Sequence, residues 1–265
     1  MYLKKSYKLK RSLLKSLFLF ISNVKNFLNK HTNIYIYKKK NNVTFNPELI
    51  LQGVNDRKSA FLELAIHKEL SNGWKGLIQI GAGGPEKADF LEKFVIKYNL
   101  DSYFIDGDKK TLHLKSQRIN NRVKNNSKYI NKWISAESEK RTVYKFASQN
   151  ENLSGFTSLS KHDFLKNAQS NNKEKLLNET VKTIGIIDIT REYCNNNISL
   201  LALDCEGLDF EILKKLITHK IFPQIIVVEI LNFNDHQIEY VRKELTDNKY
   251  IIYPDISDMI AVKLF

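Results

Sequence analysis

The sequence predicts an α/β protein: a mostly parallel sheet that ends in a C-terminal antiparallel hairpin, with helices on both faces. Two apolar runs, in residues 76–85 and 198–210, stop abruptly at glycine or at acid and glycine, and a helical pattern follows each. Such runs are typical of strands buried in a parallel sheet. Residues 250–253 and 259–264 are further apolar runs, and the connection between them is shorter than the dozen or so residues of a parallel crossover. This last pair must therefore be antiparallel.

The first unit, GLIQIGAGGP, contains the clearest turn in the chain. Residues 77–80 are typical of a buried strand, and residues 81–84 of a turn that β-carbons would obstruct. Pro85 suits a first helical position, and an apolar stripe that includes Phe90 and Phe94 predicts that a helix follows at once. Backbone N–H groups at such a turn attract an anionic or polar ligand, so we expect a cofactor here.

A second short strand, SYFIDGD at residues 102–108, ends in acids roughly 25 residues after the glycine turn. In a mononucleotide-binding unit a carboxylate at this offset binds a ribose, and Asp106 is the candidate. A nicotinamide-type fingerprint would have a third small residue where Glu86 stands, so a dehydrogenase is the weaker interpretation. Because glycines also serve ordinary tight turns, a purely structural turn remains the alternative at this point.

Hydrophobic periodicity predicts the remaining elements. A polar, turn-rich stretch at residues 149–161 interrupts the strand–helix alternation and is interpreted as an insertion near the active face. Further helices are predicted at residues 56–70, 112–119 and 235–246, and further strands at residues 128–136, 141–147 and 224–230.

The basic charge of the chain is concentrated at its N-terminus. The formal net charge is +13, but residues 1–47 contain eleven of the 42 Lys and Arg residues and no acid. The remaining 31 basic and 29 acidic residues make residues 48–265 nearly neutral. Binding to a nucleic-acid backbone needs basic residues spread over the binding face, so a nucleic-acid partner is disfavoured. We expect a basic extension at 1–47 and one catalytic domain at 48–265.

Within this extension, residues 13–28 carry apolar side chains at helical spacing, flanked by lysines and an arginine. Such a basic amphipathic helix can lie in a membrane interface, or it can dock on the domain as an extra helix; both remain open. The apolar stretch between Lys15 and Lys25 is far short of the roughly 20 residues that span a bilayer. No small-residue cleavage site follows, which disfavours a secretory signal. A cytoplasmic protein, with peripheral contact to the inner face of the membrane, is expected.

The thiol and imidazole groups predict no metal centre. Cys194 and Cys205 are the only cysteines and lack metal-ligand spacing, so a reducing compartment is expected. The histidines are scattered, and none pairs with another at ligand spacing.

From about residue 73 onward, the chain resembles the FkbM-type S-adenosylmethionine-dependent methyltransferases. IQIGAGGP resembles the family's cofactor-binding glycine motif, FIDGD its acidic second-strand motif, and SLLALDCEG its Leu-Lys-Ile-Asp-x-Glu-Gly segment. VKTIGIID, YINKWISAE and PQIIVVEI fall where the family has similar segments. The resemblance implies a Rossmann-like class I fold with seven strands, and S-adenosylmethionine as cofactor.

The same resemblance assigns roles to residues at the strand ends. Gln79 stands where many methyltransferases have an acid, so the contact to the methionine end of the cofactor differs. Asp106 would hold the ribose hydroxyls, and the segment from Ser135 would lie near the adenine. The implied cofactor-binding residues are Gln79, Gly81, Ala82, Gly83, Asp106, Gly107, Ser135 and Ala136.

Methyl transfer to a hydroxyl also needs a group that removes the proton. Asp204, at the end of the apolar strand that opens the 198–210 segment, is the candidate base, and Glu206 is the candidate that orients the acceptor or shares a divalent cation. Family analogy suggests a sugar, glycan or other small-molecule acceptor. A non-catalytic binding or scaffold protein is the alternative, and a nicotinamide or nucleotide-sugar enzyme is third.

Overall fold

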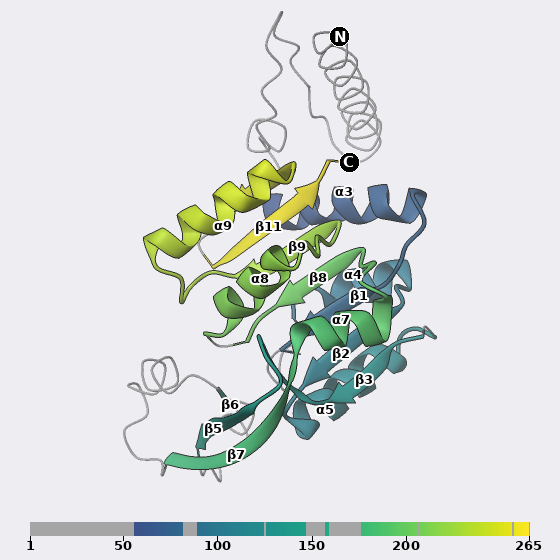
Figure 1. The fold of residues 1–265 in the computed structure, drawn as a ribbon. Helices are drawn as coiled ribbons and strands as arrows, with labels where there is room; N and C mark the ends of the chain where they lie inside the picture. The colour runs from purple at the N-terminus through teal and green to yellow at the C-terminus, as the bar shows by residue number, and fades with distance from the viewer. Residues whose placement is uncertain are drawn as a thin grey trace, which may run out of the picture.

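The computed structural model describes residues 56–81, 89–124, 126–146, 157–158, 176–205, 207–255 and 257–264. Their central feature is a seven-stranded sheet with the strand order β10-β11-β9-β8-β1-β2-β3 (Figure 1). The five strands from β9 to β3 are parallel, whereas β11 runs antiparallel to both β9 and β10. The predicted mostly parallel sheet and its C-terminal antiparallel hairpin are confirmed. The strands are β1 (Leu77–Ile80), β2 (Ser102–Asp106), β3 (Lys128–Asn131), β8 (Leu200–Leu203), β9 (Ile225–Glu229), β10 (Tyr250–Pro254) and β11 (Asp258–Lys263).

Helices cover both faces of this sheet. Alternate residues of each strand point to opposite sides, so the apolar strands present side chains to helices on either face. Leu77 of β1 belongs to an apolar cluster with the three helices of the first half of the chain, and Ile78 belongs to a cluster with the three later helices. The first set is α3 (Arg57–Ser71), α4 (Glu92–Tyr98) and α5 (Lys109–Asn120); the second is α7 (Ile186–Cys194), α8 (Asp209–Thr218) and α9 (Asp235–Asp247).

The helix after the glycine turn starts later than the sequence predicts. Helix α4 begins at Glu92, so Phe90 lies outside it, while Pro85 lies outside the described residues. The Asp89 carboxylate explains this start, because its Oδ1 accepts the backbone N–H groups of Leu91 at 2.7 Å and Glu92 at 3.0 Å. An aspartate side chain that accepts the N–H groups of the residues two and three positions later stabilises a turn and the start of the helix after it.

The prediction of one strand at residues 128–136 is wrong. Strand β3 ends at Asn131, and β4 (Trp133–Ser135) leaves the seven-stranded sheet to pair with β7 (Leu176–Gly185). The chain changes partner because β2 ends at Asp106, opposite Asn131, and offers no further pairing residues.

A second, smaller sheet follows from this change of partner. Its order is β4-β7-β5-β6, with β5 (Lys140–Phe146) antiparallel to β7 and to the short β6 (Thr157–Ser158). Strands β5 and β7 extend away from the seven-stranded sheet, at the lower left of Figure 1. The predicted insertion at 149–161 lies outside the described residues except for β6, and so does the extension at 1–47. No helix in the described ranges has the length and apolar content to cross a bilayer.

Candidate functional site

The carboxyl ends of β8, β1 and β2 lie side by side at the centre of the sheet. After β1 the chain adds β2 and then β3 on one side of β1. The later strands β8 and β9 are added on the other side, so the direction in which strands are added reverses between β1 and β8. Gly81, Asp106 and Asp204 occupy these three ends. A reversal of this kind opens a crevice at the strand ends, which is where open α/β sheets bind their ligands.

The glycine at the end of β1 is required by its contact with the end of β8. Gly81 has a φ of +76°, and a Cβ built on it would lie 1.7 Å from the carbonyl oxygen of Asp204. Two hydrogen bonds continue the strands at this point: the Gly81 N–H donates to Ile105 at 3.1 Å, and the Asp204 N–H donates to Ile80 at 3.0 Å. A side chain at position 81 would separate the two ends. Ala82 and Gly83, the next predicted cofactor residues, lie outside the described residues.

The end of β2 is shaped by its own carboxylate and by an indole ring. Asp106 is half-buried, and its Oδ1 accepts the backbone N–H of Asp108 at 2.7 Å. Asn131 donates to the carbonyl oxygens of Asp106 at 3.0 Å and Gly107 at 2.8 Å. A Cβ on Gly107 would lie 2.0 Å from the ring of Trp133, so the indole packs directly on the backbone of this predicted cofactor-binding glycine.

Ser135 is the last residue of β4, in the smaller sheet, and Ala136 follows it. Ser135 is fully buried, and its hydroxyl lies 2.5 Å from the Glu137 carbonyl oxygen and 2.8 Å from Thr183 Oγ1. Ala136 is half-buried. The contact with Thr183 connects β4 to β7, and the predicted place of both residues near an adenine stays a prediction.

The end of β8 presents the candidate base. The Asp204 side chain is exposed, and Glu206 lies outside the described residues. Asp209, only 1% exposed, holds the turn between them and helix α8: its Oδ1 accepts the Cys205 N–H at 2.8 Å and its Oδ2 the Gly207 N–H at 3.3 Å. Burial, together with the negative charges of Asp209 and Asp204, raises the pKa of the Cys205 thiol well above its ordinary value. The thiol is therefore protonated at neutral pH and is a poor nucleophile.

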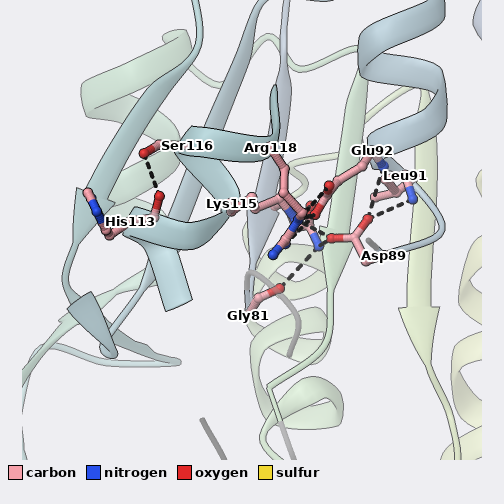
Figure 2. Close-up of polar contacts among 9 residues, drawn as sticks. Gly81, Asp89, Leu91, Glu92, His113, Lys115, Ser116 and Arg118 are labelled. Atoms are coloured by element: carbon pink, nitrogen blue, oxygen red, sulfur yellow. Dashed lines mark hydrogen bonds and ion pairs between the residues drawn. The ribbon is translucent and has the colours of Figure 1, made fainter. Parts of the chain in front are cut away.

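A buried polar network that the sequence did not reveal lies behind the glycine turn. Gln79 is 4% exposed; its Nε2 donates to the Gly81 carbonyl oxygen at 3.2 Å and to Asp89 Oδ2 at 2.9 Å. Its Oε1 accepts from Lys115 Nζ at 2.9 Å. Lys115 is fully buried and forms an ion pair with Asp89. Figure 2 shows Lys115, Asp89 and the Gly81 carbonyl gathered in this network.

Two further charges complete the network. Glu92 is 1% exposed and lies 3.8 Å from Lys115 Nζ. Arg118, one helical turn after Lys115, donates to both carboxylate oxygens of Glu92, at 2.6 Å and 3.0 Å. Burial alone would raise the pKa of Asp89, but the Lys115 ammonium and hydrogen bonds from Lys115, Gln79 and Leu91 hold it below its ordinary value. The sequence signal that could have revealed this network is Lys115, a lysine on the apolar face of helix α5.

No cluster of three or more His, Cys, Asp or Glu side chains that could hold a metal ion occurs in the part of the chain that the structure describes. The described strand ends therefore offer backbone groups and single carboxylates. Such groups suit hydrogen bonding to a polar organic ligand.

Comparison with known proteins identifies the family. A model of the methyltransferase FkbM domain matches residues 79–252, which is more than half of the chain and runs from β1 into β10. A search of the curated proteins gave no match. The chain belongs to the FkbM methyltransferase family, as the motifs at the strand ends predict.

Proposed function

We propose that this member of the FkbM methyltransferase family transfers a methyl group from S-adenosylmethionine to an oxygen acceptor, a hydroxyl on a sugar or glycan-type molecule. The observation that carries the proposal is the meeting of three strand ends at the reversal of the sheet order. Gly81, Asp106 and Asp204 come from β1, β2 and β8, and the absence of a side chain at Gly81 lets the first and third ends touch. Ligands of open α/β sheets bind at such a reversal.

The residues at these ends fit a nucleoside cofactor. Gly81 places no side chain at the end of β1, and the Asp106 carboxylate at the next strand end is an acceptor suited to ribose hydroxyls. S-adenosylmethionine supplies a methyl group on a sulfonium sulfur that is open to in-line displacement. The protein's share in such a reaction is mainly to align the acceptor with that methyl group and to exclude water.

Asp204 supplies the base that an alcohol acceptor needs. A hydroxyl becomes a better nucleophile when its proton leaves as the new bond forms, and a carboxylate within hydrogen-bond reach can take that proton. Asp204 is exposed at the end of β8 and its backbone contacts Gly81, so its carboxylate borders the proposed cofactor turn. The Asp209 carboxylate keeps the following turn in place by holding the N–H groups of Cys205 and Gly207. Glu206 is proposed to orient the acceptor.

The first experiment tests the cofactor site by isothermal titration with S-adenosylhomocysteine. The wild-type chain should bind it saturably, and Asp106→Ala should weaken binding at least tenfold. Asp101→Ala is the matched control, because Asp101 immediately precedes β2 at the strand's opposite end and is exposed. Its affinity should equal that of the wild type. A folded wild type that does not bind would refute the proposal.

The second experiment tests the chemistry with radiolabelled S-adenosylmethionine and a panel of saccharide and small-molecule acceptors. Asp204→Asn should abolish transfer while leaving S-adenosylhomocysteine affinity unchanged, because the amide cannot take the proton. Asp101→Asn should transfer at the wild-type rate. Binding without transfer to any acceptor, in the wild type as in Asp204→Asn, would instead support a binding or scaffold protein.

A further inference from the structure

We propose that Gln79, Asp89 and Lys115 are positioning residues that hold Gly81, the first residue of the glycine turn, from inside the protein, and that Gln79 acts through the Gly81 carbonyl rather than by touching the cofactor. This inference rests on the proposed function, because the turn matters as the cofactor site. It assigns Gln79 a role different from the direct contact that the motif alone predicts.

The hydrogen-bonding capacity of Gln79 is the first reason. A glutamine amide has two donor hydrogens on Nε2 and an acceptor oxygen Oε1. The two hydrogens are used by the Gly81 carbonyl oxygen at 3.2 Å and Asp89 Oδ2 at 2.9 Å, and Oε1 accepts from Lys115 at 2.9 Å. Both donors are directed to protein atoms, Oε1 faces the buried Lys115 ammonium, and only 4% of the residue is exposed, so the amide is directed inward on all sides.

The burial of Lys115 is the second reason. A lysine ammonium is costly to bury unless it is paired, and Lys115 is 0% exposed. Its ammonium lies between the Asp89 carboxylate and the Gln79 amide oxygen, and 4.6 Å from the centre of the Phe104 ring. The side chain therefore holds Gln79 without being accessible to a ligand.

The charge balance of the network explains why residue 79 is an amide. Lys115 and Arg118 carry two positive charges, and Asp89 and Glu92 carry two negative charges. A glutamate at position 79 would add a third carboxylate within hydrogen-bond distance of Asp89 and would lose the two donors that Gln79 supplies. Like charges at this distance repel, and the Gly81 carbonyl would lose its side-chain donor.

The variant Gln79→Glu distinguishes direct contact with the cofactor from positioning of Gly81. If residue 79 touched the cofactor's amino group directly, a carboxylate would keep or raise the affinity for S-adenosylhomocysteine. The positioning role predicts an affinity at least tenfold weaker near neutral pH. It also predicts partial recovery as the pH is lowered, because a protonated glutamate regains one donor hydrogen. The groups that face the new carboxyl are Lys115 and Arg118 of α5, Asp89 before α4, and Glu92 of α4.

Lys115→Met tests the same network from a residue that the ligand cannot reach. Its affinity for S-adenosylhomocysteine should also fall at least tenfold. Lys68→Met is the matched control: Lys68 is a largely buried lysine that donates to the Lys263 carbonyl oxygen at 2.6 Å, where α3 meets the end of β11. This control should lower the melting temperature and leave the affinity unchanged.

The outcomes distinguish this inference from the proposed function. Saturable binding by the wild type, with weakened, pH-dependent binding by Gln79→Glu, supports the inference. Wild-type affinity in a folded Gln79→Glu at neutral pH overturns it, even if Lys115→Met fails to fold. If the wild type itself does not bind S-adenosylhomocysteine, the proposed function fails and this inference fails with it.

Discussion

The turns after β1 and β8 begin at Gly81 and Asp204, which lie side by side, yet the protein holds these two starting points in different ways. The turn after β1 is held by Gln79, whose amide connects the Gly81 carbonyl to the buried Lys115 and Asp89. The turn after β8 is held by a single carboxylate, Asp209, which accepts two backbone N–H groups. One turn needs a charge-balanced network from two helices, and the other needs one local side chain.

The difference follows from which backbone groups each turn presents. A buried carbonyl oxygen such as that of Gly81 needs a donor, and the buried Gln79 amide that supplies it has an oxygen that needs a donor in turn. Lys115 satisfies it, and the ammonium in turn needs Asp89. Backbone N–H groups need only an acceptor, which a carboxylate supplies directly. Substitutions at the first turn should therefore be coupled, whereas those at the second should act locally.

The contact between the two turns should show the largest effect. Gly81→Val places a β-carbon 1.7 Å from the Asp204 carbonyl oxygen at a φ of +76°, so both turns must move. We expect a loss of more than about 4 kcal/mol in the free energy of unfolding, and no S-adenosylhomocysteine binding.

Gly73→Ala is the control for this substitution. Its φ of +91° imposes similar backbone strain, but a Cβ at this position would lie 4.0 Å from its nearest neighbour, Lys75 Nζ. The loss should be about 1 kcal/mol, with binding retained. Urea unfolding measures both variants, and equal losses would show that the contact of the two turns contributes nothing.

Breaking the network at β1 should cost less and should depend on pH. Lys115→Met leaves the Asp89 carboxylate, whose side chain is only 19% exposed, without its cation, and such a loss is about 3 kcal/mol near neutral pH. In the wild type the pKa of Asp89 lies below its ordinary 3.8, so its stabilisation is present above that value and is lost as the pH falls through the lowered pKa. In the variant the Lys115 ammonium no longer lowers the pKa of Asp89, so this pKa is higher than in the wild type and the variant loses stability relative to the wild type as the pH rises.

The stability difference between wild type and Lys115→Met should therefore widen from about pH 4 to about pH 7. Urea unfolding at several pH values measures it. Asp89→Asn in the Lys115→Met background removes the titrating group and should abolish the widening. A difference that is constant over this range would contradict the assigned pairing of Lys115 with Asp89.

The two turns also differ in how far the sequence predicts them. The apolar runs of β1 and β8 predicted two central strands of the sheet, because buried parallel strands are nearly continuous apolar runs, and the acids and glycines after them predicted where the candidate site lies. Asp209 lies four residues after Cys205, so its contact is local. Lys115 lies 36 residues after Gln79, and only the packing of α5 on the sheet brings them together.

The sequence did carry one trace of the first network. Lys115 lies between Leu112 and Ile119 at helical spacing, on the face that α5 buries, where a lysine needs a partner. The interruption at Lys132, between β3 and β4, had no comparable signal in the sequence. The change of partner from β2 to β7 is set by the length of β2 and not by the composition of residues 128–136.

The smallest loss of stability is expected at the turn after β8. It tests whether this turn, held by the Asp209 carboxylate, is independent of the network at β1. Asp209→Ala leaves the N–H groups of Cys205 and Gly207 without their carboxylate acceptor, which should cost about 2 kcal/mol in the free energy of unfolding. Because the change is local, its cost should add to that of Lys115→Met in the double variant. Coupling of more than about 0.5 kcal/mol would contradict this independence, and would mean that the network at β1 and the turn at β8 act as one unit through the contact of Gly81 with Asp204.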